Sequence, residues 1–340
     1  MNTINVLYQH DNNYAVFGGV SMLSLFENNK EADHICVYFI DVGLSDEYKK
    51  QYRELAERYD RRVVFLDGTP YVKYLEEAGM PKYRGSYATY MKLFVCEMLP
   101  DDVERIYYLD SDTLVTRNLR PLFEMDMEGK ALWMAIDGMS LNFKEIYGFS
   151  KEEPYFCGGT MLIDVKQWKR QQYTKRLIDY AVNVRSAYFA VDQDLMNNAF
   201  KGEIGVLDAR YDFLYIHTIY NDKMFLKRYK GSAYYTESEL IDARNHIAVL
   251  HFMRFLGESP WNAETLHPHK KEFDKYLAIS PWKDYVKKAS GKKGIFVVEK
   301  VMYRYLPRAL FFKIFMTYYS YYVKKADREL KSVTSKNVGY

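Results

Sequence analysis

Strand-like and helix-like patterns alternate along the first 110 residues of this chain. The strand-like segments are 4–9, 34–40, 62–66 and 105–109, and the segments with helical periodicity are 14–28, 45–59 and 88–99. Strands separated by helices predict βαβ units, and therefore an α/β fold with a mostly parallel sheet flanked by helices. Ligands of such sheets bind beyond the carboxyl ends of the strands. Polar clusters follow two of the expected strands there, at 9–13 and 110–112.

The rest of the chain is less regular. Further strands are expected at 132–136, 160–165 and 247–250, and further helices at 175–185 and 193–200. The segment KKASGKKG at 287–294 has the composition of a linker.

Charge divides the chain near that linker. The sequence has 48 Lys and Arg residues and 45 Asp and Glu residues, a net charge of +3. Residues 283–340 hold 14 basic and 4 acidic residues, a balance of +10, so residues 1–282 hold 34 and 41, a balance of −7. A basic tail behind an acidic body indicates an anionic partner for the tail. We therefore expect one domain at 1–282 and a basic, aromatic, helical extension at 283–340.

The extension contains a candidate amphipathic helix at 306–323. Its apolar residues at helical spacing are Leu310, Phe311, Ile314, Phe315 and Tyr318. A basic, aromatic helix of this kind is typical of a segment that lies on an anionic bilayer. The alternative is a C-terminal helix that docks on the protein's own core. No RNA-binding motif accompanies the basic residues, so a nucleic acid partner is not expected.

Cysteine content and the first residues bear on the compartment. The three cysteines are an odd number at wide spacing, which argues against a disulfide framework or a zinc site. The first residues, MNTINVLYQHDNNY, lack the basic and apolar regions of a secretory signal. No run reaches the roughly 18 apolar residues that a membrane span needs. These features predict a cytoplasmic protein, peripheral on the inner face of the membrane.

The segment RIYYLDSDTLV at 105–115 is the most informative part of the chain. Its apolar strand leads directly into Asp110, Ser111 and Asp112. Two carboxylates at i and i+2 in a turn can reach one hard cation, and Mg²⁺ and Mn²⁺ prefer such oxygen ligands. Asp is also a common turn former, so an ordinary turn is one alternative.

A phosphatase is a second alternative for this segment. D-x-D-T-L resembles the nucleophile motif of haloacid-dehalogenase-type phosphatases, in which Asp110 would be phosphorylated and Asp112 would act as acid and base. That motif belongs on the first strand, near the N-terminus. Here about one hundred residues of βαβ pattern precede it.

Six stretches in order resemble a known family. They are YQHDNNYA at 8–15, SYATYMKL at 86–93, YLDSDTLV at 108–115, FCGGTMLID at 156–164 with Trp168, DQDLMN at 192–197, and HFMRFLGESPW at 251–261. Together they resemble glycosyltransferase family 8, the retaining, metal-dependent enzymes that include bacterial lipooligosaccharide α-galactosyltransferases and glycogenin. The resemblance covers roughly 4–265. It implies a GT-A fold, a UDP-sugar donor, Mn²⁺ or Mg²⁺ as cofactor, and transfer of galactose or glucose to a glycan acceptor, which a membrane-bound tail would bring within reach if it is lipid-linked.

The resemblance assigns the first polar cluster to the nucleotide. Asp11, Asn13 and Tyr14 match the loop that holds uridine, with Tyr14 stacking on the base. Gln9 opens this loop at the end of the first expected strand. A polar, amide-rich loop at a strand end also suits the edges of a ribose and a base.

The second polar cluster is matched to the metal. Asp110 and Asp112 match the metal-binding pair, with Ser111 between them, and His251 matches the third ligand. Without the family, a lone His after an apolar strand is more often structural.

Four further residues match the donor sugar site. Gly158 and Gly159 match a small-residue turn where the backbone approaches the sugar closely. Gln193 matches the residue beneath the anomeric carbon, and Asp192 matches a carboxylate that binds sugar hydroxyls. Because an amide is a poor nucleophile, we expect a front-face, ion-pair-like transfer, with Asp192 as the alternative nucleophile of a covalent route.

Three positions depart from the family pattern. Lys92 stands where Arg is frequent, Cys157 replaces a common Asn, and Ser259 stands where Lys is expected. The last change removes a cation from the diphosphate, and we expect Arg254 to replace it while Gly257 offers a backbone N–H. The departures also leave open a degenerate protein that binds nucleotide without transfer.

Overall fold

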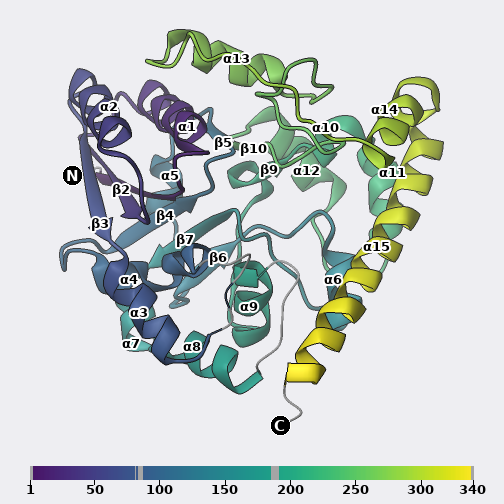
Figure 1. Cartoon of the computed structure of the whole chain (residues 1–340), viewed down its shortest axis with the longest axis horizontal. Coiled ribbons are helices and arrows are strands. Elements are labelled where there is room, and N and C mark those ends of the chain that lie inside the picture. The colour runs from purple at the N-terminus through teal and green to yellow at the C-terminus, as the bar shows by residue number, and fades with distance from the viewer. Residues whose placement is uncertain (1–2, 81, 83–86, 185–190, 338–340) are drawn as a thin grey trace.

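The computed structural model describes residues 3–80, 82, 87–184 and 191–337, and its centre is a seven-stranded sheet (Figure 1). The strands are β1 (Thr3–Gln9), β2 (His34–Asp41), β3 (Arg62–Asp67), β4 (Arg105–Leu109), β6 (Leu132–Met134), β7 (Thr160–Asp164) and β8 (Gly205–Val206). They lie in the order β3-β2-β1-β4-β7-β6-β8. In this order β3, β2, β1 and β4 run parallel to one another, and β7 is antiparallel to both β4 and β6. The predicted mostly parallel, mixed α/β sheet is confirmed.

Helices cover both sides of this sheet (Figure 1). In the first half of the chain they are α1 (Ala15–Asn28), α2 (Asp46–Arg58), α3 (Thr69–Glu77), α4 (Val95–Met98), α5 (Arg120–Glu124), α6 (Ser140–Tyr147) and α7 (Val165–Arg170). Those that follow are α8 (Tyr173–Val184), α9 (Val191–Ala199), α10 (Ile216–Ile219), α11 (Asp222–Leu226), α12 (Glu237–Asn245), α13 (Lys270–Ile279), α14 (Ile295–Tyr305) and α15 (Arg308–Asn337). Among the described residues, no helix is both long and apolar enough to cross a bilayer.

The elements agree with the sequence pattern except at 88–99. The helix predicted there is confirmed, but its winding differs: it is a 3₁₀ helix at Ala88–Phe94, followed by the single turn of α4. The side chains of 90–96 are all buried, and the tighter winding packs them against neighbouring elements on several sides. Of the predicted segments, Ser86, Arg185 and residues 338–340 lie outside the described residues.

A second, three-stranded sheet brings distant residues together. It contains β5 (Thr113–Val115), β10 (Val249–His251) and β9 (Phe213–Leu214), in the order β5-β10-β9. His251 pairs with Thr113 on one side and with Leu214 on the other. Because Asp112 directly precedes β5 and Asp212 directly precedes β9, this register places two carboxylates beside His251.

The tail docks on the body along one edge of the molecule (Figure 1). Phe311, Phe312, Met316 and Val323 of α15 are buried. The predicted face of five residues is therefore wrong in part: Phe311 and Phe315 join an apolar cluster with the body, whereas Leu310, Ile314 and Tyr318 are exposed. The reason is the body's aromatic surface, where the Phe312 ring lies 4.5 Å from Tyr220 and 6.1 Å from Phe225. A boundary at 282/283 stays a prediction.

Candidate active site

The polar clusters that follow β1 and β4 lie side by side, because these strands are parallel neighbours. In the first, Asp11 accepts hydrogen bonds from the backbone N–H and the side-chain amide of Asn13, both at 2.9 Å. These bonds form a tight turn that leaves Asp11 and Asn13 exposed. The side-chain amide of Gln9 donates to the carbonyl of Ala88, while its buried Oε1 has no hydrogen-bond partner. The four predicted nucleotide residues thus lie together at the carboxyl end of β1: Gln9, Asp11, Asn13 and Tyr14.

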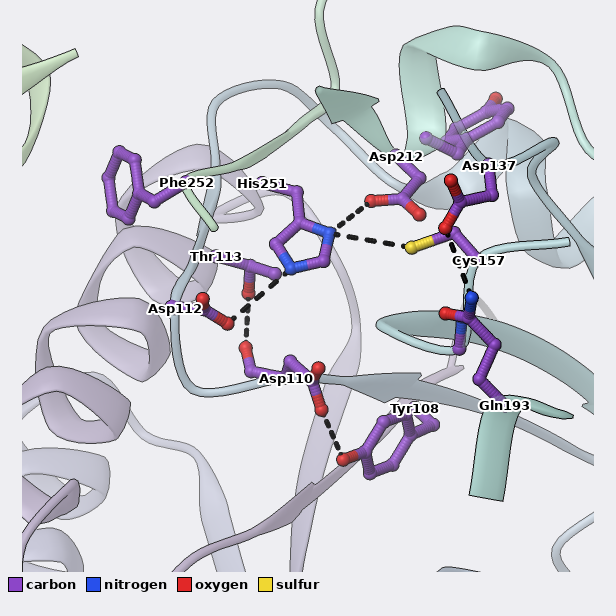
Figure 2. Close-up of polar contacts among 12 residues, drawn as sticks. Tyr108, Asp110, Asp112, Thr113, Asp137, Cys157, Gln193, Asp212, His251 and Phe252 are labelled. Atoms are coloured by element: carbon purple, nitrogen blue, oxygen red, sulfur yellow. Dashed lines mark hydrogen bonds and ion pairs between the residues drawn. The ribbon is translucent and has the colours of Figure 1, made fainter. Parts of the chain in front are cut away.

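The aspartates of the second cluster are held by their backbone. The Asp110 N–H donates to the Gly159 carbonyl at 2.8 Å, and the Phe252 N–H donates to the Asp112 carbonyl at 2.9 Å. Thr113 Oγ1 donates to the Asp110 carbonyl at 2.8 Å, and the Tyr108 hydroxyl donates to the Asp110 carboxylate at 2.5 Å. These bonds hold both carboxylates beyond the end of β4 (Figure 2).

His251 completes this group. Its Nδ1 lies 2.8 Å from Asp212 Oδ1, and its Nε2 lies 3.5 Å from Asp112 Oδ1 (Figure 2). Because Nδ1 faces buried Asp212, the second ring nitrogen, Nε2, is directed toward the aspartates. Ligand atoms of Asp110, Asp112 and His251 all lie within 4.8 Å of one another.

The electrostatics of this group favour a cation. Burial raises the pKa of Asp110 to about 6; Lys92 opposes this rise and Asp112 adds to it. Burial also disfavours the charged forms of Asp112 and His251, but their attraction, with Asp212, outweighs it: the pKa of Asp112 is lowered and that of His251 raised. Two carboxylates and an imidazole suit Mn²⁺ or Mg²⁺, whose charge would stabilise both carboxylates. The residues present fit such an ion.

Cys157 forms a second possible ligand group with Asp212 and His251. Its sulfur lies 4.0 Å from His251 Nδ1. Burial raises the pKa of the Cys157 thiol, so the thiolate that a metal requires is disfavoured. Cys157 is therefore disfavoured as a metal ligand in this group.

Ser111, the central residue of the D-S-D segment, is held by a hydrogen bond to His10. The Tyr52 hydroxyl donates to the Ala15 carbonyl at 2.5 Å, so His10 Nε2, 2.8 Å away, must donate to Tyr52. His10 Nδ1 is then an acceptor, and Ser111 Oγ donates to it at 2.7 Å. Burial lowers the pKa of His10 to about 4, which keeps it neutral, as this chain of bonds requires.

Gln193 is held by two hydrogen bonds. Its Oε1 accepts from the Gly158 N–H at 2.8 Å. Its Nε2 donates to Asp137 Oδ2 at 3.1 Å (Figure 2). Burial raises the pKa of Asp137 to about 6. A Cβ at Gly158 would lie 3.0 Å from Gln193 Cβ, and a Cβ at Gly159 would lie 2.1 Å from His251 Cε1. These glycines therefore make room for two site side chains, whereas the sequence predicted room for the ligand.

Lys92 links the remaining site carboxylates. It is buried, forms an ion pair with Asp192, lies 3.9 Å from Asp110 and donates to the Gly158 carbonyl at 3.4 Å. Burial disfavours its charge, but Asp192, Tyr108 and Asp110 outweigh this and raise its pKa. Asp192 lies in the first turn of α9, as the acidic D-Q-D pattern predicts.

The loop at 251–261 connects the site to the tail. Arg254 Nη2 donates to the Tyr14 hydroxyl at 3.3 Å, so Arg254 lies at the predicted base. Gly257 has φ +75°, and a Cβ there would lie 2.5 Å from the Phe296 ring of α14. Buried Glu258 forms an ion pair with Lys300 of α14. Ser259 uses its N–H to bind Asn262 Oδ1 at 2.8 Å.

Sequence reasoning missed four residues of this arrangement: His10, Asp137, Asp212 and Glu258. Each acts through a partner that is distant in sequence, such as Ser111, 101 residues from His10. Asp137 and Asp212 follow or precede short strands, and this position at a strand end is the one signal that could have indicated them.

Sequence similarity to known proteins identifies the family of this chain. The family described as "Glycosyl transferase family 8" matches residues 5–265. General stress protein A of Bacillus subtilis is 27% identical over 280 residues, which cover 80% of this chain and 92% of that protein. Lipopolysaccharide 1,2-glucosyltransferase of Escherichia coli K12 is 27% identical over 288 residues, 83% of this chain and 79% of that protein.

A solved structure shares the fold. It is the galactosyltransferase LgtC in complex with donor and acceptor sugar analogs, which superposes with a TM-score of 0.64 and 23% identity over 82% of this chain and 96% of LgtC. The predicted GT-A fold is confirmed by this similarity. The chain belongs to glycosyltransferase family 8 and is a glycosyltransferase with the GT-A fold.

Proposed function

We propose that this hexosyltransferase moves galactose or glucose from a UDP-sugar to a hydroxyl of a lipid-linked glycan in cell-surface polysaccharide synthesis. Relatives named as lipopolysaccharide glucosyl- and galactosyltransferases support the hexose and the glycan. The observation that supports the chemistry best is the convergence of Asp110, Asp112 and His251. The turn at Gly158 and Gly159 links this group to Gln193, because Gly158 donates to Gln193 and Gly159 accepts from Asp110.

In this proposal the nucleotide lies over the ends of β1 and β4. Asp11 and Asn13 bind uridine, Tyr14 stacks on the base, and Arg254 provides positive charge near the diphosphate. Gln9 and the Gly257 N–H complete this part of the site. The exposed carboxylate of Asp11 supports its role at uridine. Arg254 helps to lower the pKa of Asp112, and this attraction supports its role near the diphosphate.

Asp110, Asp112 and His251 would hold Mn²⁺ or Mg²⁺. Bound there, the ion would stabilise negative charge on the departing diphosphate. The chain itself orients these ligands. His10 anchors Ser111, which lies between the two aspartates, and Asp212 anchors His251. Ligands fixed in this way need little rearrangement when the donor binds.

In this proposal Gln193 lies beneath the anomeric carbon of the donor. The hydrogen bonds that it accepts from Gly158 and donates to Asp137 support a fixed amide at this position. The ion pair between Asp192 and Lys92 lowers the nucleophilicity of Asp192 and supports the front-face route. Asp192 then binds sugar hydroxyls, while Lys92 balances the charge of the carboxylates. Gly158 and Gly159 form the turn beside the sugar.

We also propose that the tail lies on an anionic membrane, from the cytoplasmic side, and that 1–282 is the catalytic domain. Ten of the fifteen exposed large apolar side chains among the described residues lie between Ile295 and Tyr322. Extended apolar surface of this kind marks an interaction site. The neighbouring lysines and arginines of the tail suit anionic lipid.

One assay tests the proposed reaction. The protein is incubated with UDP-glucose or UDP-galactose, with Mn²⁺ or with EDTA, and release of UDP is measured; p-nitrophenyl phosphate serves as the control substrate. We expect UDP release with Mn²⁺ and none with EDTA. Binding of the nucleotide without UDP release would favour the degenerate alternative, and cleavage of p-nitrophenyl phosphate would favour the phosphatase.

A further inference from the structure

A tight hairpin turn directly follows Arg254. The backbone N–H of Phe255 donates to the Glu258 carbonyl at 2.8 Å, and the N–H of Glu258 donates to the Phe255 carbonyl at 3.0 Å. The two residues between them, Leu256 and Gly257, have φ values of +53° and +75°, as a type I′ turn requires. A leucine in this left-handed conformation is strained, so the turn depends on support from its surroundings.

Helix α14 provides part of that support. The ring of Phe255 packs edge-on against the ring of Tyr303, with 4.8 Å between their centroids. On the same helix, Phe296 fills the space beside Gly257, because a Cβ at this glycine would lie 2.5 Å from the Phe296 ring. The shape of the turn is therefore matched to α14, and a displacement of this helix would displace the turn.

Glu258 joins the turn to α14 through its charge. Its carboxylate is buried, and Oε1 forms an ion pair with Lys300 of α14 and accepts a hydrogen bond from Ser290 Oγ at 3.1 Å. The second oxygen, Oε2, is also buried and has no hydrogen-bond partner among the described residues. Lys300 and Ser290 thus provide the compensation that a buried carboxylate needs, and Lys300 provides its counter-charge.

The chain between α13 and α14 holds the other end of the same loop. The N–H of Ala263 donates to the Lys288 carbonyl at 3.0 Å, and the side-chain amide of Asn262 donates to the same carbonyl at 3.3 Å. Lys287 Nζ donates to the Pro260 carbonyl at 3.5 Å. The loop is therefore fixed at both ends by residues that lie C-terminal to it in the sequence.

Arg254 is the residue of this loop that faces the donor site. Its side chain is exposed, and its Nη2 donates to the Tyr14 hydroxyl at 3.3 Å. It also lies close enough to Asp112 to help lower the pKa of that carboxyl group. A long, exposed side chain loses much rotamer freedom when it is held in one place, so its position depends on a fixed backbone.

We propose that Glu258 is a positioning residue for the donor. Through its ion pair with Lys300 it fixes the turn on α14, and the turn in turn holds Arg254 toward the diphosphate. The inference rests on the proposed function, which gives Arg254 that place, and adds that α14 controls donor affinity. If the ion pair only stabilised the fold, its removal would lower the melting temperature and leave nucleotide affinity unchanged.

Titration with UDP tests this proposal, by calorimetry with Mn²⁺ and without acceptor. Glu258→Gln with Lys300→Met removes both charges of the pair at nearly constant size, so no unpaired charge is left buried. We expect this double variant to raise the Kd for UDP by about fivefold, through the loss of coupling between α14 and the loop. An unchanged Kd would overturn the proposal.

Two single variants serve as controls for this titration. Lys300→Arg keeps the ion pair and should bind UDP as the wild type does. Lys293→Met removes a positive charge from an exposed side chain seven residues upstream, and it should also leave the Kd unchanged. A fivefold rise in Lys293→Met would show a general effect of charge and overturn the proposal.

A second titration shows whether the effect passes through Arg254. In an Arg254→Ala background, the double substitution at Glu258 and Lys300 should leave the Kd for UDP unchanged, because the side chain that the turn positions is absent. The same fivefold loss in both backgrounds would mean that the ion pair acts on another part of the site, and would overturn the proposal.

The proposed reaction can fail independently of this inference. The titrations measure binding alone, so they decide the role of Glu258 even in a protein that transfers no sugar. Conversely, Mn²⁺-dependent release of UDP from a UDP-sugar, together with an unchanged Kd in the double variant, would support the reaction and reject the positioning role. A protein that binds no UDP would contradict both.

Discussion

The donor end of the central sheet and the C-terminal tail differ in how their side chains are partnered. At the donor end, Tyr8 and Tyr52 are fully buried, and even the neutral imidazole of His10 has a partner on each nitrogen. In the tail, Phe311 is buried, while Leu310 and most apolar residues of α14 are exposed. The first region is therefore organised before a ligand arrives, and the second offers surface to an external partner.

Removal of one site carboxylate should have the largest effect. We expect Asp110→Asn or Asp112→Asn to lower kcat/KM by on the order of 1000-fold, because the diphosphate loses its counter-charge. Coupled measurement of UDP release checks this. Asp101→Asn, a change at an exposed carboxylate before β4, is the control and should leave the rate unchanged. Metal-dependent activity in both site variants would contradict the metal assignment.

The preorganisation itself can be tested at Asp212. Asp212→Asn keeps the side-chain size but weakens the hydrogen bond that orients His251. We expect the Kd for Mn²⁺, measured by electron paramagnetic resonance without donor, to rise by about 10- to 100-fold. Asp208→Asn, four residues upstream at a half-exposed position, is the matched control. The same Kd in Asp212→Asn and the wild type would mean that the pair does not orient the ligand.

Acid should lower the free energy of unfolding through His217, which packs against Phe225 in the part of the body that contacts the tail. Burial lowers the pKa of His217 to about 4, so the unfolded chain binds a proton more readily between pH 6.5 and 4. The stability present above pH 6.5 is therefore lost as the pH falls toward 4, by about 2 kcal/mol at pH 5 for this group.

Urea unfolding at pH 7.5 and pH 5 measures this loss. We expect His217→Gln to show the smaller difference between the two pH values. His246→Gln, which changes a half-exposed histidine, should behave as the wild type. An identical pH dependence of all three proteins would reject the role of His217.

A smaller effect is expected at Arg254. Arg254→Ala removes a positive charge and the hydrogen bond to Tyr14, so the KM for the donor should rise about tenfold. Arg254→Lys retains the charge and should lose less. Steady-state kinetics in which Arg254→Ala leaves both KM and kcat unchanged would mean that the loop does not replace the missing lysine.

The tail should give the smallest effect, on membrane binding alone. Leu310→Asp with Ile314→Asp should weaken sedimentation with phosphatidylglycerol vesicles several-fold, because both residues are exposed on α15. Substitution is preferable to truncation, since removal of Phe311 and Phe312 would uncover the body's aromatic cluster. Ile241→Asp, exposed on α12, is the control. If Ile241→Asp weakened sedimentation as much as the two tail substitutions, the tail would have no special role in membrane binding.

Much of the sheet could be predicted because its strands are short, buried apolar runs. The D-x-D pair followed from the polar end of such a run, but His251 depended on the family resemblance, since its approach requires the pairing of β5 with β10. No local pattern marks that pairing. Asp212 was missed for the same reason.

The buried face of the tail could not be predicted either. Apolar and aromatic residues occur all around α15, so periodicity alone did not show that Phe312 and Met316 face the body. The buried face of α15 is determined by its contacts with the aromatic rings of Tyr220 and Phe225, which belong to a different part of the chain.

The contact of His10 with Ser111 has a consequence for how this sequence can vary. A Cβ at Gly18 would lie 2.3 Å from the His10 ring, and Ser111 donates to that ring. A larger residue at position 18 requires a smaller one at position 10, which in turn leaves the hydroxyl at 111 without its acceptor. Positions 10, 18 and 111 should therefore covary among homologues, although 101 residues separate the first from the last.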